Sequence, residues 1–429
     1  MEIKNLYQLF RQHPVITTDS RNIPANSLFF ALKGDNFNGN KFALEALTKG
    51  AAFAVIDEPE FDTNDRMILV DNVLQSLQQL ARYHRSQLNV PILAITGTNG
   101  KTTTKELIAA VLSKKFNIHY TQGNLNNHIG VPLTLLSMTP DTEIGIIEMG
   151  ASHPGEIKLL CEIADPDFGI VTNIGKAHLE GFGSFEEIIK TKSELYDYLR
   201  EKDGKCFINA DNSLLIKQSN GLEHISYGKS SDYYLAGELA TTDYNLVVKA
   251  LFPKGWLYLK SKLIGYYNFE NLLAAACVGK YFKVDPLLIQ GALAEYTPSN
   301  NRSQLIRNEK NTIIMDAYNA NPTSMMMALS NFANIKHERK GLILGDMLEL
   351  GDKSVEEHLK VLKMIQSIDA DKVILVGPVF RKISLSSGFK AFSNVNDLIE
   401  YLRDEPLQGK TILIKGSRGM KLEKIYEVL

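Results

Sequence analysis

A glycine-rich stretch between residues 97 and 103 carries the side chains best suited to phosphate chemistry. The apolar run PILAIT precedes it, and residues from Thr102 through Lys115 are predicted to form a helix. Glycines let backbone N–H groups turn inward around an anion, and a helix N-terminus adds partial positive charge. Lys101 could then reach the β- and γ-phosphates of a nucleotide, and the Thr102 hydroxyl could bind Mg²⁺. The predicted phosphate-binding residues are Gly97, Thr98, Asn99, Gly100, Lys101, Thr102 and Thr103.

This stretch departs in one position from the strict phosphate-loop pattern GxxxxGK[ST]. Ile95 stands where the pattern has its first glycine, whereas Gly100, Lys101 and Thr102 fit the pattern. The competing interpretation is a glycine turn with an incidental lysine. A buried strand before the turn and a helix after it favour phosphate binding.

Polar residues also follow the next two apolar runs. Glu148 ends the run EIGIIE, and His178 follows the run FGIVTNI. Ligands gather at the carboxyl ends of parallel strands, where a carboxylate is a hard oxygen ligand for Mg²⁺. The alternatives are a solvated loop glutamate and a surface or structural histidine. Lys192, in the helical segment KTKSELYDYL, is by itself typical of a charged helix face.

Two further polar segments follow strands near the C-terminus. Residues 316–322, DAYNANP, follow the run TIIM, and residues 415–418, KGSR, follow TILI. The first could be a capped turn that starts a helix at Asn321-Pro322, and the second a basic anion contact or an ordinary turn. Strand-end polar residues in two separate α/β units predict a ligand in the cleft between them.

The hydrophobic pattern predicts an α/β protein of three domains. Residues 1–85 carry short strand-like runs around the amphipathic segment FALEALTKG and form a small N-terminal α/β domain. Residues 86–298 carry near-continuous apolar strands, typical of a parallel sheet covered by helices, and then antiparallel hairpins between Tyr233 and Gly265. The cluster TPSNNRSQ, 297–304, marks the next boundary. Residues 299–429 alternate strands with helices as a doubly wound, Rossmann-like domain does.

Composition excludes several other classes of protein. The 429 residues are 44% hydrophobic and 22% charged, with Lys+Arg 47 against Asp+Glu 49, so there is no basic surface for nucleic acid. No apolar run reaches the ~18 residues that a membrane span needs. The three cysteines form no CxxC pair, and the first residues contain no apolar signal segment. We therefore expect a cytoplasmic protein with no membrane insertion.

Nine strings together make the chain resemble the Mur ligase family, the ATP-dependent amide-bond-forming enzymes of bacterial cell-wall synthesis. They occur in the family's order and span nearly the whole chain. YNANPTSM is similar to the members that add D-alanyl-D-alanine, and the DNPR signature of the members that add the third residue does not occur. The strings are TDSRNIPANSLFFALKGDNFNGNKF, GTNGKTTTKE, GNLNNHIGVPLTLL, EMGASHPGEI, TNIGKAHLEGFGS, GYYNFENLLAA, DAYNANPTSM, LGDMLELG and KGSRGMKLE.

The resemblance implies a reaction and its partners. ATP would phosphorylate the terminal carboxylate of a UDP-N-acetylmuramoyl-tripeptide, and the amine of D-alanyl-D-alanine would attack the acyl phosphate. Mg²⁺ would offset charge during phosphoryl transfer. Thr102 and Glu148 would hold one ion, and His178 would serve a second. Lys192 matches the family lysine that CO₂ carbamylates, which turns an ammonium into an anionic oxygen ligand. We expect a monomer.

The resemblance also implies roles for residues outside the glycine-rich stretch. Arg302 matches an arginine near the γ-phosphate, and Ser20 and Arg21 match a motif that contacts the uridine nucleotide. His128 and Tyr267 depart from the usual acidic residue and histidine, which affects local substrate contacts and the adenine site. The remaining nucleotide contacts would be Asn268, Asn271 and Asp316, and the remaining substrate contacts Asn126, Asn127, Tyr318, Asn319 and Asn321.

Three other functions compete with this interpretation. A nucleotide-hydrolysing switch or motor would share the glycine-rich stretch, but no NKxD guanine motif occurs and a full second α/β unit suggests a second substrate. A folylpolyglutamate- or cyanophycin-type ligase would share the fold, but the DSR string at 19–21 favours a UDP substrate. A non-catalytic binder would not need the intact GKT sequence and Glu148.

Overall fold

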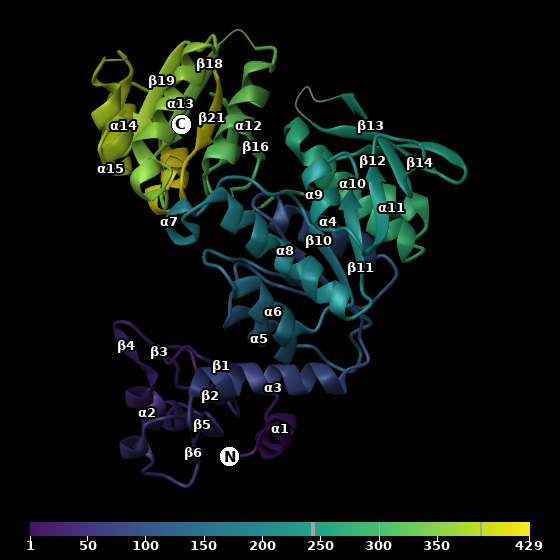
Figure 1. The fold of residues 1–429 in the computed structure, drawn as a ribbon. Helices are drawn as coiled ribbons and strands as arrows, with labels where there is room; N and C mark the ends of the chain where they lie inside the picture. Colours follow the sequence, from purple (N-terminus) through teal and green to yellow (C-terminus); the bar gives the residue numbers. More distant parts are fainter. Residues whose placement is uncertain (242–244, 300, 338, 387) are drawn as a thin grey trace.

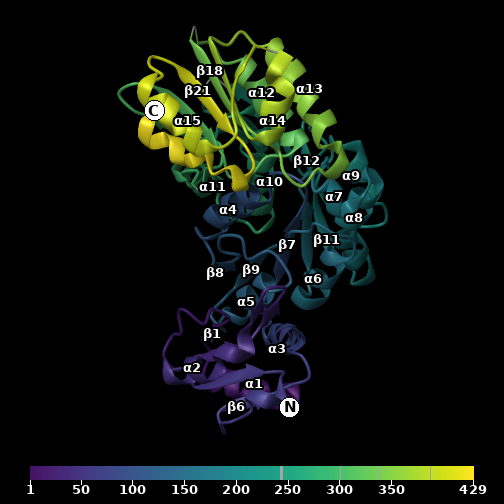
Figure 2. The same ribbon diagram turned by 90° about the vertical axis from the view of Figure 1, so that its left-hand side faces the viewer.

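The chain folds around three separate sheets that follow one another along the sequence. The computed structural model describes residues 1–241, 245–299, 301–337, 339–386 and 388–429. Parts of the predicted hairpin region (242–244) and of the predicted boundary cluster (300) therefore lie outside the described residues. The N-terminal and C-terminal units lie at opposite ends of the molecule with the middle unit between them (Figures 1 and 2). The three-domain α/β prediction is confirmed, whereas the boundaries after residues 85 and 298 stay predictions.

The N-terminal sheet has four parallel strands in the order β1-β2-β5-β6. A short antiparallel hairpin, β3–β4, lies beside it. The short apolar runs SLFFAL, AAFAVID and MILV, which predict strands in this unit, form β2, β5 and β6. The elements are α1 (Ile3–Gln12), β1 (Ile16–Thr17), β2 (Leu28–Phe30), β3 (Lys33–Gly34), β4 (Phe37–Asn38), η1 (Gly39–Phe42), α2 (Ala43–Thr48), β5 (Phe53–Ile56), η2 (Pro59–Phe61) and β6 (Met67–Leu69).

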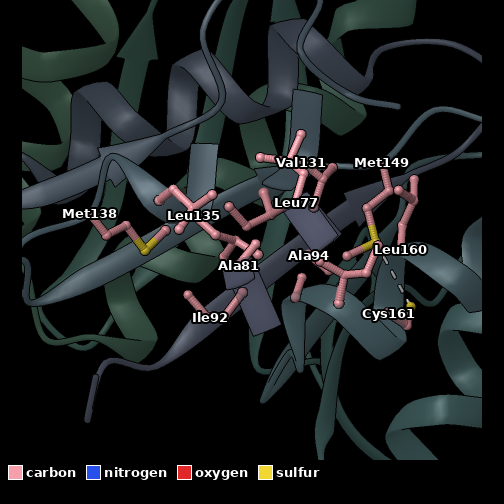
Figure 3. Close-up of a cluster of buried hydrophobic side chains, with 14 of the residues drawn as sticks. Leu77, Ala81, Ile92, Ala94, Val131, Leu135, Met138, Met149, Leu160 and Cys161 are labelled. Carbon is pink, nitrogen blue, oxygen red and sulfur yellow. Dashed lines mark hydrogen bonds between the residues drawn. The ribbon is translucent and has the colours of Figure 1, made fainter. Parts of the chain in front are cut away.

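Helix α3 (Val73–Gln87) connects this sheet to the middle of the molecule. The segment LQSLQQLARYHRSQL, 74–88, predicts this connecting helix. Its first turn is capped by Asn72, whose side chain accepts a hydrogen bond of 2.8 Å from the backbone N–H of Gln75. Leu77 and Ala81 on its buried face pack in one cluster with Val131 and Leu135 (Figure 3). Because this apolar face is shared with the middle unit, α3 fixes the N-terminal unit onto its neighbour.

The middle sheet has nine strands in the order β15-β14-β13-β12-β11-β10-β7-β9-β8. In this sheet order, every neighbouring pair between β13 and β8 is parallel. Strand β14 pairs antiparallel with both β13 and β15, as predicted. The elements are β7 (Ile92–Thr96), α4 (Lys101–Leu112), β8 (Ile118–Tyr120), α5 (Gly130–Leu136), β9 (Ile144–Glu148), α6 (Glu156–Ala164), β10 (Phe168–Val171), α7 (Leu179–Phe182), α8 (Phe185–Glu201), β11 (Lys205–Asn209), α9 (Ser213–Gln218), β12 (Glu223–Gly228), β13 (Leu235–Thr241), β14 (Val247–Phe252), β15 (Gly255–Lys260), η3 (Tyr266–Asn268), α10 (Phe269–Tyr281) and α11 (Pro286–Glu295).

Both faces of this sheet are covered, which explains the near-continuous apolar runs. Along β7, Ile92 and Ala94 belong to the cluster that contains α3, α5, α6 and α8 residues, whereas Leu93 and Ile95 belong to the cluster that contains α4, α10 and α11 residues. Alternate side chains of a strand point to opposite faces, so each face needs its own apolar residues.

The C-terminal sheet has six strands in the order β16-β17-β21-β18-β19-β20, all parallel except β16. The apolar runs at 312–318, 341–347, 372–377 and 411–416 predict strands, and they form the four central strands β17, β18, β19 and β21. The elements are β16 (Gln304–Arg307), β17 (Thr312–Asp316), α12 (Pro322–Ala333), β18 (Lys340–Gly345), η4 (Gly351–Lys353), α13 (Ser354–Gln366), β19 (Lys372–Val376), α14 (Pro378–Ile383), η5 (Ser384–Ser386), β20 (Lys390–Phe392), α15 (Val395–Asp404), β21 (Thr411–Lys415), η6 (Arg418–Met420) and η7 (Leu422–Val428).

The sequence of residues 419–428 predicts one last α-helix, but the structure has no α-helix there. Two 3₁₀ segments, η6 and η7, stand there and are separated by Lys421, which has a φ of +52°. A left-handed residue interrupts the regular backbone, so a single α-helix cannot run through it. None of the helices in the described ranges has the length and hydropathy that crossing a bilayer requires.

Candidate functional site

A cavity of about 930 Å³ lies beyond the carboxyl ends of strands from the middle and C-terminal sheets. Its walls bring together residues predicted from seven separate parts of the sequence. Gly97, Lys192, Ser20 and Arg21 are not part of its lining. The predicted residues in its lining are Thr98, Asn99, Gly100, Lys101, Thr102, Thr103, Asn126, Asn127, Glu148, His178, Asn268, Asn271, Arg302, Asp316, Tyr318, Asn319 and Asn321.

The glycine-rich loop between β7 and α4 depends on its two glycines. Gly97 has a φ of +136°, and a Cβ atom there would lie 2.1 Å from Oγ1 of Thr172. Gly100 has a φ of +80° and precedes α4, and its Cβ would lie 2.5 Å from Oδ1 of Asn271. Both positions combine a left-handed backbone with no room for a side chain, so the loop conformation requires glycine.

Asn173, directly after β10, holds this loop in place. Its Oδ1 accepts a hydrogen bond of 3.0 Å from the Asn99 backbone N–H, and its Nδ2 donates one of 3.0 Å to the Asn99 carbonyl. The backbone N–H of Thr98 also donates to the Asn173 carbonyl at 2.9 Å. The loop is therefore fixed before any ligand binds.

Lys101, the first residue of α4, lies across the glycine-rich loop. Its ammonium donates hydrogen bonds to the carbonyls of Gly97 at 2.7 Å and Thr98 at 3.1 Å. Burial lowers the pKa of Lys101; the nearby Glu148 carboxylate opposes this shift, and the charge of Arg302 adds to it. The ammonium thus sits beside a second cation, an arrangement that an anionic ligand would stabilise.

Glu148, at the end of β9, is held by two donors on one of its oxygens. Its Oε1 accepts hydrogen bonds from the Thr102 hydroxyl at 3.1 Å and from Asn126 Nδ2 at 2.8 Å. Its Oε2 is buried and has no hydrogen-bond partner among the described residues, and the Lys105 ammonium lies 3.7 Å away. A buried carboxylate oxygen left open beside a threonine hydroxyl fits the oxygen ligand set that Mg²⁺ prefers.

His178 precedes α7 with a φ of +48° and pairs with Glu349, which follows β18. The contact joins His178 Nδ1 to Glu349 Oε2, and the hydrogen bond from His178 lowers the pKa of Glu349. The structure therefore shows this histidine in contact with the C-terminal unit. Glu349 was not predicted, although its string LGDMLELG follows an apolar run as the other site strings do.

Lys192 lies inside α8 with 3% of its surface exposed. Burial lowers the pKa of Lys192 well below its usual value, and the Lys101 ammonium lowers it further. Within the described ranges no carboxylate lies within ion-pair distance of Lys192, and the Phe182 ring is 5.8 Å from its Nζ. This shift favours the neutral amine, the form of a lysine that can react with CO₂.

Asn268 and Asn271 link the loop helix α4 to α10. The Thr104 hydroxyl donates to Asn271 Oδ1 at 3.0 Å, and Asn271 Nδ2 donates to Asn268 Oδ1 at 2.8 Å. Asn268 Nδ2 in turn donates to the Ile264 carbonyl at 2.8 Å. These amides form a chain of hydrogen bonds behind Gly100, so a change at one amide is transmitted to the loop.

The C-terminal wall of the cavity carries three cations, of which one is paired with a carboxylate and two lie over the same tyrosine ring. Lys415 Nζ donates to Asp316 Oδ2 at 2.6 Å, which neutralises both groups. Arg302 Cζ lies 3.5 Å from the ring centroid of Tyr318, and Arg302 Nε is buried without a hydrogen-bond partner among the described residues. Arg418 Cζ lies 5.3 Å from the centroid of the same ring. Two arginines with unused donors make this wall receptive to anions.

Ser20 and Arg21 lie apart from this cavity, between β1 and β2. Arg21 Nε pairs with Asp19 Oδ1 at 2.8 Å, and this hydrogen bond lowers the pKa of Asp19 to about 2. The Arg21 side chain is 88% exposed. Any ligand that contacts both Arg21 and the cavity must therefore be extended.

Several residues of the site were not predicted from the sequence. Asn173 and Glu349 both follow apolar runs, so their strand-end positions were a usable signal. Lys105 gave none, because it lies on a helix among other polar residues. Asp211 and Lys229 also line the cavity, and they follow β11 and β12, two strands that were not predicted either.

A fixed phosphate-type loop with an open carboxylate faces a second α/β unit across a polar cavity, an arrangement that suits an enzyme joining a nucleotide-activated substrate to a second substrate. Models of the Mur ligase family match the chain in three stretches. The catalytic-domain model matches residues 14–85, the middle-domain model residues 95–279, and the glutamate ligase domain model residues 301–418. The chain belongs to the Mur ligase family.

Individual relatives agree with this assignment. The UDP-N-acetylmuramoyl-tripeptide–D-alanyl-D-alanine ligase of Bacillus subtilis is 35% identical over 96% of this chain and 92% of its own length. A crystal structure of MurF from Acinetobacter baumannii is 28% identical with a TM-score of 0.87, covering 98% of this chain and 97% of that one. MurF ligase from Thermotoga maritima in complex with ADP is 26% identical with a TM-score of 0.85, covering 97% of each chain.

Proposed function

We propose that this chain is an ATP-dependent ligase that adds D-alanyl-D-alanine to a UDP-N-acetylmuramoyl-tripeptide, forming ADP, in peptidoglycan precursor synthesis. The observation that carries the proposal is the cavity in which the glycine-rich loop faces Arg302, Tyr318 and Asn321 of the C-terminal unit. Relatives bearing this activity in their names align with nearly the whole chain. We place the enzyme in the cytoplasm as a monomer.

The reaction proceeds in two chemical steps. A carboxylate oxygen of the tripeptide attacks the γ-phosphorus of ATP, and the bond to the β,γ-bridging oxygen breaks to release ADP. The neutral amine of D-alanyl-D-alanine then attacks the acyl carbon. The tetrahedral intermediate loses phosphate and the amine proton passes to solvent, which leaves the amide. Backbone N–H groups of residues 97–103, with Lys101 and Arg302, would stabilise the charge that develops on the transferred phosphoryl group.

We assign the metal-binding roles to four side chains. Thr102 and Glu148 would hold one Mg²⁺, and the unpartnered Oε2 of Glu148 supports this role. His178 and the carbamate form of Lys192 would serve a second Mg²⁺. The burial of Lys192 and its lowered pKa support carbamylation. Bound Mg²⁺ would neutralise phosphate charge and orient the reacting oxygens. Pairing of His178 with Glu349 gives this histidine an oriented ring before a ligand arrives.

We assign the remaining contacts by the family motifs in which each residue stands. Asn268, Asn271 and Asp316 would bind the nucleotide, and Ser20 and Arg21 the uridine diphosphate end of the long substrate, in the domain that we end at residue 85. Asn126 and Asn127 would contact the peptide part. Tyr318, Asn319 and Asn321 would contact the incoming dipeptide. Because these groups lie on separate units, we expect the domains to close on the ligands.

An ADP-release assay with a panel of UDP-N-acetylmuramoyl-tripeptides tests the proposed function. The third residue of the tripeptide, meso-diaminopimelate or lysine, is varied, and each reaction is run with and without D-alanyl-D-alanine. We expect ADP release to require both the tripeptide and the dipeptide. Equal turnover without the dipeptide would instead indicate a nucleotide-hydrolysing switch or motor.

A further inference from the structure

The turn after β21 is held in place by two neighbouring segments, the one that follows β17 and the one that follows β18. Lys415 is bound to Asp316, as described above, and also donates to the Asn319 carbonyl at 3.3 Å. The Ser417 hydroxyl donates to the Ala320 carbonyl at 3.2 Å and accepts from the Leu348 backbone N–H at 2.9 Å. Because its neighbours are fixed, Arg418 projects from a rigid base at the edge of the cavity.

The guanidinium of Arg418 is exposed and uses little of its binding capacity. Its Nη1 lies 3.5 Å from the Tyr318 hydroxyl, at the limit of a hydrogen bond. Of the ion pairs within 4.0 Å found in the described part of the chain, none involves Arg418. Lys415 on the same turn has its charge neutralised by Asp316, so Arg418 is the cation of this turn that can bind an external anion.

The second arginine on the Tyr318 ring belongs to the phosphate side of the cavity. Arg302 is close enough to Lys101 for its charge to lower the pKa of that ammonium. Both groups line the cavity, and the unpartnered Nε of Arg302 leaves it a donor for the anion that Lys101 faces. Arg418, which forms no ion pair with the described residues, is available to a second, separate anion.

We infer that Arg418 binds the C-terminal carboxylate of the acceptor dipeptide, an inference that rests on the proposed function. The acceptor brings one amine and one carboxylate to the cavity. The amine must reach the acyl phosphate, whereas the carboxylate is repelled by the phosphates and needs a counter-charge at a distance. A guanidinium offers two parallel N–H donors that match a carboxylate. The carboxylate would thus orient the dipeptide with its amine toward the glycine-rich loop.

The test compares D-alanyl-D-alanine with its C-terminal amide as acceptors. The wild-type enzyme, Arg418→Met, Arg418→Lys and Lys424→Met are assayed for ADP release at saturating ATP and tripeptide. Lys424 lies in η7, is exposed and is outside the cavity lining, so it controls for the loss of one positive charge. For wild type and the Lys424 variant we expect a higher kcat/KM for the acid than for the amide.

In Arg418→Met we expect the KM for the acid to rise by about 10-fold or more, as the loss of a charged hydrogen bond predicts. The KM for ATP should stay unchanged, the acid-to-amide preference should disappear, and Arg418→Lys should keep part of it. A preference that survives in Arg418→Met, or is absent in wild type, would overturn the inference while leaving the ligase function intact. Failure of wild type to use either acceptor would overturn the proposed function itself.

Discussion

The side chain of Asn321 joins the two walls of the cavity. Its Nδ2 donates a hydrogen bond of 2.8 Å to Oδ1 of Asn99 in the glycine-rich loop. Its Oδ1 accepts one of 2.8 Å from the Ser324 backbone N–H and so caps α12. One amide therefore both starts a helix of the C-terminal unit and holds the loop that we assign to phosphate binding.

Replacing Asn321 with aspartate should separate these two roles. The introduced carboxylate could still accept from the Ser324 N–H, but it would have no donor for Asn99 Oδ1. We expect Asn321→Asp to unfold at the wild-type temperature and to lose about 10-fold in kcat/KM, the size expected for one lost hydrogen bond at an unpaired acceptor. Asn321→Ala loses both bonds, and its free energy of unfolding should fall by about 1 kcal/mol. Because the Asn99 amide could flip and donate its unpartnered Nδ2 to the new carboxylate, full activity in both variants is the result that would show that the bond between the walls has no role.

Removing the Lys101 ammonium should abolish ligation without unfolding the protein. Among the described residues the ammonium donates hydrogen bonds to loop carbonyls alone, and the buried Glu148 carboxylate keeps its Thr102 and Asn126 donors without it. We expect Lys101→Ala to lower kcat by at least ~100-fold, as removal of one group that stabilises developing charge does. Circular dichroism should stay unchanged. Near-normal turnover would refute the assignment of residues 97–103 as the phosphate loop.

Lys192→Ala should lose activity that small carboxylates such as acetate or formate partly restore. The carboxylate would replace the oxygen atoms of the carbamate in the space that the side chain leaves. Activity of the wild type should also fall when CO₂ and bicarbonate are removed and return when they are added. Burial lowers the pKa of Lys192, which favours the neutral amine that reacts with CO₂.

Lys190 on the same helix gives the matched control for this prediction. Its side chain is 76% exposed, and Lys190→Ala should retain wild-type kcat and show no response to added carboxylate. Steady-state ADP release measures all three proteins. Full activity of Lys192→Ala without added carboxylate would contradict the carbamate.

Local sequence pattern, together with the family motifs, predicted the central strands of the N-terminal and C-terminal sheets and many of the polar residues that line the cavity, whereas strands such as β11 and β12 were missed. Glu148, His178, Asp316 and Lys415 each follow an apolar run, and parallel strands bring such positions to one edge of a sheet. The glycines at 97 and 100 predicted a turn that other residues cannot form. These signals depend on chain neighbours alone, which is why the sequence carries them.

Contacts between the units could not be predicted in this way. The pairing of His178 with Glu349 and of Asn99 with Asn321 depends on how two units dock, which no periodicity encodes. Strands β8, β16 and β20 have only three or four residues each, too few for an alternating pattern to stand out. Lys105 was missed because a buried charge on a polar helix face resembles an exposed one until the neighbouring strand is placed.

The central claim is that a carboxylate is activated by ATP as an acyl phosphate and captured by the dipeptide amine. The most direct measurement starts with tripeptide labelled with ¹⁸O in its terminal carboxylate, together with ATP and D-alanyl-D-alanine. Mass spectrometry then follows the inorganic phosphate and the amide. Our account predicts one ¹⁸O atom in each phosphate released for each amide formed, because the attacking carboxylate oxygen leaves with the phosphoryl group. Unlabelled phosphate, or phosphate released without amide, would contradict it.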